Sequence, residues 1–184
     1  MDATPNSVNT PYRCAEPMTW ATRRAIPSDA AAACDVVRRS IVELCYDDHQ
    51  GDEATLAIWL ANKTPAAFEQ WIGSEQNVAL VAERDNELIG FALLNLRGTV
   101  ALLYVSPQAR FSGISKALLA GLEEAALAAE VREVRLNSSA TALRFYTRCG
   151  YSPTGPSFKA FGIASGYPMS RQMGSASGNL VPST

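Results

Sequence analysis

The stretch YVSPQARFSGISKALL, residues 104–119, decides the predicted fold because a strand, a short loop and a helix follow one another there. No Asp or Glu falls in the first turn of the predicted helix, residues 113–130, although the positive end of a helix dipole favours acidic side chains. Gly113 lets a ligand approach the backbone closely, and Arg110 and Lys116 flank the helix start. Free amide groups, a dipole and two cations predict a phosphate site. An ordinary helix start that lacks an acidic residue is the alternative.

Apolar strands are predicted on both sides of this unit. Residues 78–83 and 88–96 flank the turn signal Asp85-Asn86 and indicate a hairpin, which residues 100–105 extend to a three-stranded antiparallel meander. Residues 131–137 follow the long helix and indicate a strand parallel to residues 100–105, because such crossovers are right-handed and join parallel strands. The predicted fold class is therefore α/β (α+β), a mixed sheet with helices on its faces.

The remaining elements lie nearer the two ends of the chain. A first strand is expected within residues 18–26, and a helix with Ser28 as its N-cap is expected to stop near Gly51. Further elements are helices starting at Asp52 and Thr64, a helix over residues 141–149, and strands from Tyr151 onward and within residues 159–173.

Length and composition predict one domain. The chain has 184 residues, of which 47% are hydrophobic and 18% charged, so it can bury a core of its own. We expect a single domain over residues 18–173. Residues 1–17 contain three prolines and predict a flexible arm, and the Gly/Ser-rich residues 174–184 predict a disordered tail.

Charge and motif content exclude several classes of protein. A formal charge of −2 lacks the basic footprint of a nucleic-acid binder, and neither a Walker A loop nor a Rossmann glycine motif occurs. No apolar run approaches the ~20 residues that span a bilayer, and no signal peptide is evident, so we expect a cytoplasmic protein without a membrane partner. Cys14, Cys34, Cys45 and Cys149 form no C-x-x-C pair, and one histidine is present, so no metal site or disulfide framework is expected.

Two motifs resemble the signatures of the GNAT superfamily of N-acetyltransferases. Residues 110–115, RFSGIS, resemble the pattern R/Q-x-x-G-x-G/A, with Ser115 where the family has Gly or Ala. Residues 136–151, LNSSATALRFYTRCGY, resemble the second signature, in which a strand ends in Asn and a helix carries Phe-Tyr before a Gly-aromatic exit. Both occur in the family's order, and a looser resemblance extends over residues 19–173.

The resemblance implies a largely antiparallel sheet in which a central parallel strand pair splays apart around acetyl-CoA. The backbones of Leu103 and Val105 would pair with the pantetheine arm. Asn137 would orient the cofactor or a bound water, or would simply cap the strand end. The residues placed around the diphosphate are Arg110, Phe111, Ser112, Gly113, Ile114, Ser115 and Lys116, of which the last fits a solvated surface lysine equally well.

The resemblance also implies direct attack of a neutral amine on the thioester. Tyr146 would protonate the departing thiolate, with a packed aromatic anchor as the alternative role. The general base is left open between Glu83 and His49. Asp47 and Asp48, expected in the last turn of the first helix where the dipole disfavours acids, are candidates for binding a cationic amine. A solvated helix end is the alternative for that region.

The function predicted from these residues is transfer of an acetyl group from acetyl-CoA to a primary amine of a small molecule or peptide. A non-catalytic acyl-CoA binding or sensor module is the alternative. Dimers are common among proteins of this fold, so a homodimer is an open expectation.

Overall fold

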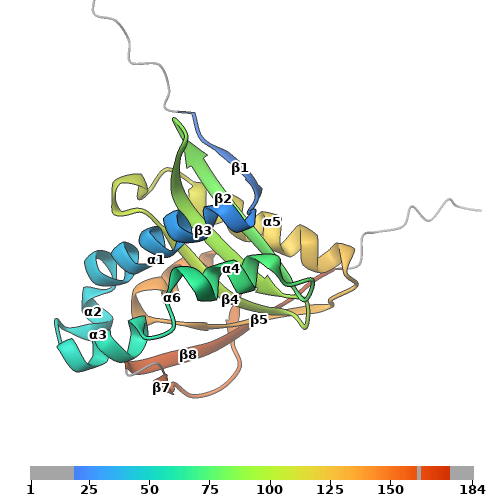
Figure 1. Ribbon diagram of the computed structural model, residues 1–184. Coiled ribbons are helices and arrows are strands. Elements are labelled where there is room, and N and C mark those ends of the chain that lie inside the picture. The colour runs from blue at the N-terminus through green and yellow to red at the C-terminus, as the bar shows by residue number, and fades with distance from the viewer. Residues whose placement is uncertain (1–18, 161–162, 175–184) are drawn as a thin grey trace, which may run out of the picture.

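The computed structural model describes residues 19–160 and 163–174, which form a sheet flanked by helices (Figure 1). The arm predicted over residues 1–17 lies outside the described residues, as does the predicted tail beyond Gly174. The strands of the described part follow the order β1-β2-β3-β4-β5-β8-β6, and β7 pairs with β8. Their bounds are β1 Ala21–Arg24, β2 Asn77–Arg84, β3 Glu87–Asn95, β4 Thr99–Val105, β5 Glu133–Ser138, β6 Ser152–Pro153, β7 Phe158–Ala160 and β8 Ile163–Gln172.

The predicted meander is confirmed. β2, β3 and β4 pair antiparallel, and β4 pairs parallel with β5 after the helical crossover, so the mixed α/β sheet is as expected. Asp85 and Asn86 join β2 to β3 with φ of 52° and 63°. Two successive positive φ angles are the geometry of a two-residue hairpin turn whose twist matches its strands. The Asp-Asn pair tolerates that conformation, which explains why the turn signal was informative.

Helices cover both faces of the sheet and divide the core in two. α1 and α4 pack against β2, β3 and β4 on one face, and α5 packs against the same strands on the other. Apolar side chains of α5, such as Leu118 and Leu122, form one core cluster, whereas Ile41 of α1 and Phe68 of α4 belong to the second. The helix bounds are α1 Ala30–Leu44, α2 Tyr46–His49, α3 Glu53–Leu60, α4 Pro65–Gly73, α5 Ile114–Ala128 and α6 Ala140–Arg148.

Helix starts on the first face were predicted with mixed success. Asp52 and Thr64 cap α3 and α4 as expected, because their side chains accept bonds from the backbone N–H of Thr55 and Ala67. The prediction of Ser28 as an N-cap is wrong. Ser28 lies inside a 3-10 turn, Pro27–Asp29, and Asp29 directly precedes α1.

The first helix is also shorter than predicted. α1 ends at Leu44, and the separate helix α2 occupies residues 46–49. Asp47 and Asp48 therefore lie in the first turn of α2, where the dipole favours acids, and not in the last turn of a long helix. Both acids thus follow the preference for negative charge near a helix N-terminus.

Candidate active site

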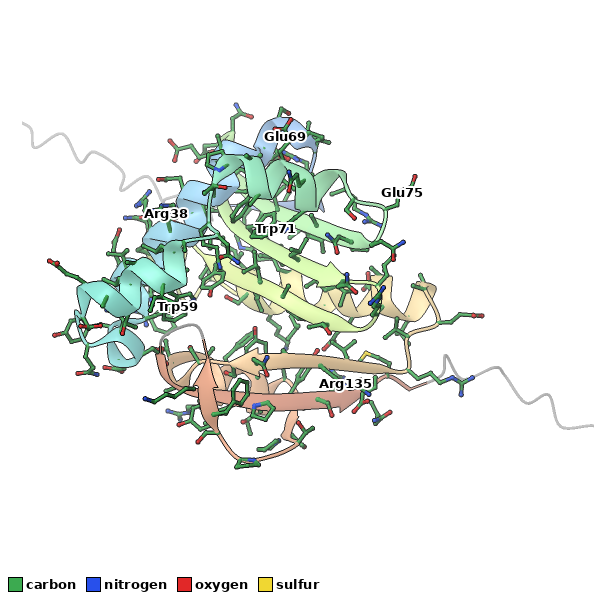
Figure 2. The ribbon with its side chains drawn as sticks, turned by 60° about the horizontal axis from the view of Figure 1, so that its bottom comes forward. Arg38, Trp59, Glu69, Trp71, Glu75 and Arg135 are labelled. Atoms are coloured by element: carbon green, nitrogen blue, oxygen red, sulfur yellow. The ribbon has the colours of Figure 1, made fainter. Side chains whose placement is uncertain are left out.

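β4 and β5 pair over a very short length before they separate. Thr99 pairs with Arg135 and Val100 with Leu136, and pairing between the two strands ends there. A β-bulge explains the separation. Leu94 pairs with Val100 but Leu93 pairs with Leu102, so one extra residue of β4 lies opposite the β3 ladder at that point. A bulge bends its strand, and β4 leaves β5 immediately beyond it. Figure 2 shows the two parts of the sheet diverging.

A cavity of about 1010 Å³ occupies the region where the strands part. Its wall includes side chains from both core layers, so it passes from one face of the sheet to the other. The structure brings into this wall all the residues that the resemblance placed against coenzyme A, namely Leu103, Val105, Arg110, Phe111, Ser112, Gly113, Ile114, Ser115, Lys116 and Asn137.

The start of α5 forms one end of the cavity. Gly113 precedes the helix with φ of 86°, a left-handed conformation that favours glycine, and no side chain caps the helix N-terminus. The first turn contains no acidic residue. Two hydrogen bonds fix the loop before the helix. Trp20 donates a 3.2 Å bond to the Ser112 carbonyl, and the Ser112 hydroxyl donates a 2.6 Å bond to the Ala109 carbonyl. This end can therefore offer free amides to an anion.

Positive charge and an exposed ring lie beside that loop. The Arg110 guanidinium sits 4.7 Å from the centre of the Phe111 ring, and Phe111 is 95% exposed with φ of 60°. Phe111 and Gly113 both have positive φ and Ser112 lies between them, and alternating backbone conformations of this kind can form an anion-binding concavity. Both features suit a negatively charged ligand.

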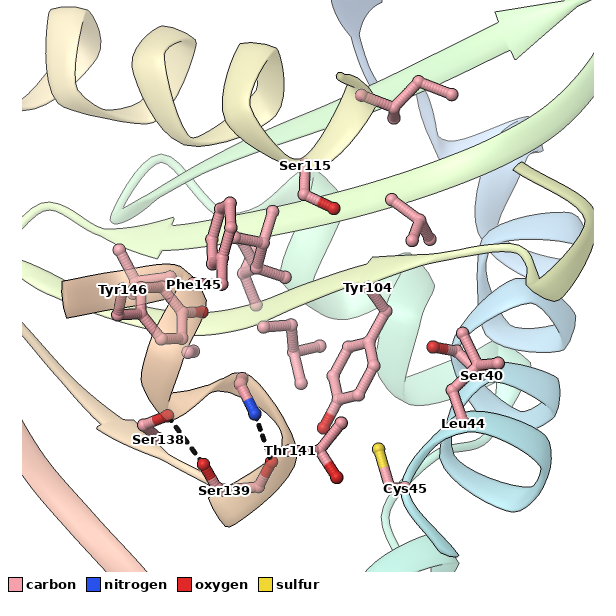
Figure 3. Close-up of a pocket in the computed structure, with 18 of the residues that line it drawn as sticks. Ser40, Leu44, Cys45, Tyr104, Ser115, Ser138, Ser139, Thr141, Phe145 and Tyr146 are labelled. Carbon is pink, nitrogen blue, oxygen red and sulfur yellow. Dashed lines mark hydrogen bonds between the residues drawn. The ribbon is translucent and has the colours of Figure 1, made fainter. Parts of the chain in front are cut away.

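α6 carries Tyr146 into the same cavity (Figure 3). Tyr146 is 7% exposed, and burial raises the pKa of its phenol above the ordinary value. Its ring contacts Phe145 at 5.1 Å and Tyr151 at 5.7 Å between centroids. The hydroxyl has no hydrogen-bond partner among the described residues. Tyr146 is therefore both packed as an anchor and protonated at neutral pH, with a donor left over for a ligand.

Asp48 adds a second cap to the start of α6, where the Ser139 side chain already accepts a bond from a backbone N–H of the same helix. The Asp48 carboxylate accepts bonds from the backbone N–H of Ala140 at 2.7 Å and of Thr141 at 3.3 Å, which are the first residues of α6. Asp48 itself is buried. An acidic side chain supplied by one helix thus caps the N-terminus of another, and the cap ties α2 to the element that carries Tyr146.

The structure places the other predicted acid–base and acceptor residues outside the cavity wall. Glu83 accepts a 2.9 Å bond from Arg23 at the far edge of β2, and Asp47 is an exposed residue of α2. His49 is buried, with its ring nitrogens bonded to the Val42 carbonyl and the Gly51 N–H. The Asp48 carboxylate is bonded to the backbone N–H groups at the start of α6. None of the four is among the residues that line the cavity.

Tyr104 is a cavity residue that the sequence analysis missed. It lies on β4 between Leu103 and Val105, and its side chain joins the second core cluster near Cys45 (Figure 3). Burial raises the pKa of the Tyr104 phenol, and that of the Cys45 thiol to about 12. Cys45 is thus a protonated thiol and a poor nucleophile. Strand alternation around Leu103 could have flagged Tyr104, because alternate residues face opposite sides of a sheet.

Residues 19–160 and 163–174 contain neither a cluster of metal-binding side chains nor a membrane-spanning helix. No three His, Cys, Asp or Glu side chains gather there as a metal ion would require. None of the helices in that part of the chain combines the length and the apolar character needed to cross a bilayer.

Comparisons with known proteins agree with this geometry. Residues 45–172 match the family model described as "Acetyltransferase (GNAT) domain". The GCN5-related N-acetyltransferase of Rhodopseudomonas palustris is a similar solved structure, with a TM-score of 0.73, 25% sequence identity and coverage of 84% of this chain and 96% of that one. No curated protein matches the chain.

Two more distant structures share the fold and were solved with a ligand. The PaiA N-acetyltransferase of Thermoplasma acidophilum, in complex with coenzyme A, has a TM-score of 0.70 at 21% identity and covers 84% of this chain and 99% of that one. YncA of Salmonella typhimurium, with acetyl-CoA, has a TM-score of 0.67 at 19% identity and covers 86% and 96%. Because the family model spans more than half of its length, the chain belongs to the GNAT acetyltransferase family.

Proposed function

We propose that this protein transfers the acetyl group of acetyl-CoA to a primary amine. The observation that carries the proposal is the gap between β4 and β5, with the uncapped start of α5 at one end and the buried phenol of Tyr146 in its wall. Two solved structures of the same fold were determined with coenzyme A or acetyl-CoA, which supports use of the same cosubstrate here.

Each part of the wall has a task in this proposal. The amides from Phe111 to Ser115 bind the diphosphate, and Arg110 adds charge. Beyond Val100, the edge of β4 that faces β5 has lost its strand partner, so the backbones of Leu103 and Val105 bind the pantetheine amides as an added strand would. These contacts hold the thioester beside Tyr146.

The chemical step is direct. The amine nitrogen attacks the acetyl carbonyl, the C–N bond forms, the C–S bond breaks, and the sulfur leaves as a thiolate. Tyr146 donates its phenolic proton, or a hydrogen bond, to that thiolate. The proton lost by the amine passes to water, because none of the described wall residues is a carboxylate or a histidine. Holding both reactants together supplies much of the rate.

A thiol-release assay tests the proposal. The protein is mixed with acetyl-CoA and a panel of primary amines, and the free thiol is followed with a thiol-reactive dye, while calorimetry measures coenzyme A binding. We expect binding of coenzyme A and amine-dependent thiol release. Binding without any amine-dependent release would instead identify an acyl-CoA sensor, and absence of binding would overturn the proposed site.

A further inference from the structure

Lys63 lies in the cavity wall on the opposite side of the sheet from α5, and it has no acidic partner. It follows α3 and is 4% exposed. Its ammonium group donates a 2.5 Å bond to the amide oxygen of Asn62 and a 3.5 Å bond to the carbonyl of Trp59. Both acceptors are neutral, and an ammonium has three N–H donors. None of the ion pairs within the described residues includes Lys63.

We propose that the amine acceptor also carries a carboxylate, and that Lys63 binds it. A buried cation without a counter-charge is unfavourable, and burial accordingly lowers the pKa of Lys63. A ligand carboxylate supplies the missing charge and can accept the remaining N–H. The inference rests on the proposed acetyl transfer and names the class of acceptor.

The surroundings of Lys63 favour the same class. Arg38 lies outside the cavity wall and donates 2.9 Å and 3.3 Å bonds to the Lys63 and Leu60 carbonyls, so it adds no counter-charge to the ammonium. The described residues that line the cavity include no Asp or Glu. A polycationic acceptor such as a polyamine would therefore find the Lys63 ammonium at this end and no carboxylate in the described wall, whereas an anionic group is attracted.

Aromatic side chains in the same wall indicate the body that the acceptor carries beside its charged groups. Trp59 of α3, Trp71 of α4 and Tyr104 of β4 belong to the same wall and to the same core cluster, and Figure 2 labels the two tryptophans on their helices. Such rings bind flat apolar bodies well. The class assigned by these residues is an amino acid, or a similar amino carboxylate, with an apolar or aromatic body.

A binding experiment tests this class without requiring turnover. Hydrocinnamate carries the carboxylate and the aromatic ring but no amine, and hydrocinnamamide is its neutral counterpart. Each is titrated with and without saturating coenzyme A, following the fluorescence of the three tryptophans, of which Trp59 and Trp71 line the cavity and Trp20 contacts Ser112. We expect hydrocinnamate to bind more tightly than the amide and than 3-phenylpropylamine, with coenzyme A present.

Substitutions then assign the carboxylate to Lys63. Lys63→Met should weaken hydrocinnamate binding at least about tenfold, the factor that a hydrogen bond to a charged group commonly contributes, and leave the amide unaffected. Lys63→Arg keeps the charge and should retain part of the affinity. Lys159→Met removes an exposed lysine and serves as the matched control. Thermal unfolding of each variant shows whether it is folded.

The outcomes separate the two proposals. Equal binding of hydrocinnamate by the unmodified protein and by a folded Lys63→Met variant would overturn the inference, as would tighter binding of 3-phenylpropylamine or no binding of hydrocinnamate at millimolar concentration. In the thiol-release assay, L-phenylalanine should be a better acceptor than phenethylamine. If phenethylamine is the better acceptor, the acetyl transfer stands and the carboxylate assignment fails. If coenzyme A does not bind, the proposed function fails, and the titration without coenzyme A still decides the role of Lys63.

Discussion

The two ends of the cavity are built by different means. The end at α5 consists of backbone amides from one contiguous stretch, residues 110–115, with the adjacent strand β4. The opposite end is made of side chains from α1, α3, α4 and β4, which are scattered along the chain. Backbone groups can bind the same ligand in many sequences, whereas side chains differ with each protein. The first end, here called the backbone end, is therefore suited to a shared cosubstrate. The second, the side-chain end, is suited to an individual acceptor.

The largest expected effect comes from Tyr146, where the two ends meet. Tyr146→Phe keeps the packing and removes the proposed proton donor, so kcat should fall about 100-fold while the affinity for coenzyme A is unchanged. The thiol-release assay measures kcat, and calorimetry measures the affinity for coenzyme A. Tyr46→Phe, on an exposed residue of α2, is the matched control. Full activity of Tyr146→Phe at every pH would leave the phenol with a packing role only.

Substitution of Gly113 tests whether the backbone at the start of α5 binds coenzyme A. An Ala at φ of 86° is strained, at a cost of about 1 kcal/mol, and the strain shifts the amides that face the anion. Gly113→Ala should lower both stability and coenzyme A affinity. Gly51→Ala, with φ of 75° at a position outside the cavity wall, should lower stability alone. Calorimetry and chemical unfolding compare them, and equal coenzyme A affinity in both variants would contradict the role of the backbone.

A substitution of Asp48 tests whether its cap on α6 positions Tyr146 in the cavity. Asp48→Asn weakens the cap on α6 and should lower the free energy of unfolding by about 1 kcal/mol. Because α6 carries Tyr146, kcat should fall while coenzyme A affinity persists, which loss of stability alone would not produce. Asp47→Asn, on the exposed face of α2, should lower stability less than Asp48→Asn, because it removes a charge from the first turn of α2 but no cap on α6, and should leave kcat unchanged. A normal kcat in folded Asp48→Asn would show that α6 is positioned by packing.

The smallest expected effect concerns the attachment of α1, which carries part of the side-chain end. Arg23 holds Asp29 at 2.7 Å and keeps the pKa of that carboxyl below its usual range. Because the folded pKa is depressed, the pair stabilises the fold above about pH 4 and the contribution is lost as the pH falls through the folded value. Arg23 is partly exposed, so Asp29→Asn should lower stability by less than about 1 kcal/mol at pH 7. Urea unfolding at pH 7 and pH 3 should show this difference shrinking in acid, and a constant difference would contradict it.

The sequence predicted the backbone end because its signals are local. The strand, the loop and the acid-free helix start lie within residues 104–119. The glycine at position 113 itself indicates a backbone conformation that other residues disfavour. The hairpin turn at Asp85-Asn86 is local in the same sense. Elements of this kind depend on neighbours in the chain, so their residues can be interpreted without a structure.

The side-chain end could not be predicted in this way. Asp48 was assigned to an acceptor because its partners, the N–H groups of Ala140 and Thr141, are more than ninety residues away. Lys63 and Tyr104 appear in the sequence as an ordinary lysine after a helix and an ordinary strand residue. Only the three-dimensional structure, in which side chains of α1, α3, α4 and β4 line one cavity, shows that Lys63 and Tyr104 share one wall.

The short pairing between β4 and β5 has a consequence for how the molecule responds to its cosubstrate. Two residue pairs join the half-sheet β1-β2-β3-β4 to the half-sheet β5-β8-β6, and α5 adds a further link through the ion pair between Glu123 and Arg171. A molecule bound along the open edge of β4 would contact both half-sheets and stabilise their arrangement. By mass action it would raise the melting temperature, and amide exchange in β4 would slow as the concentration of coenzyme A increases.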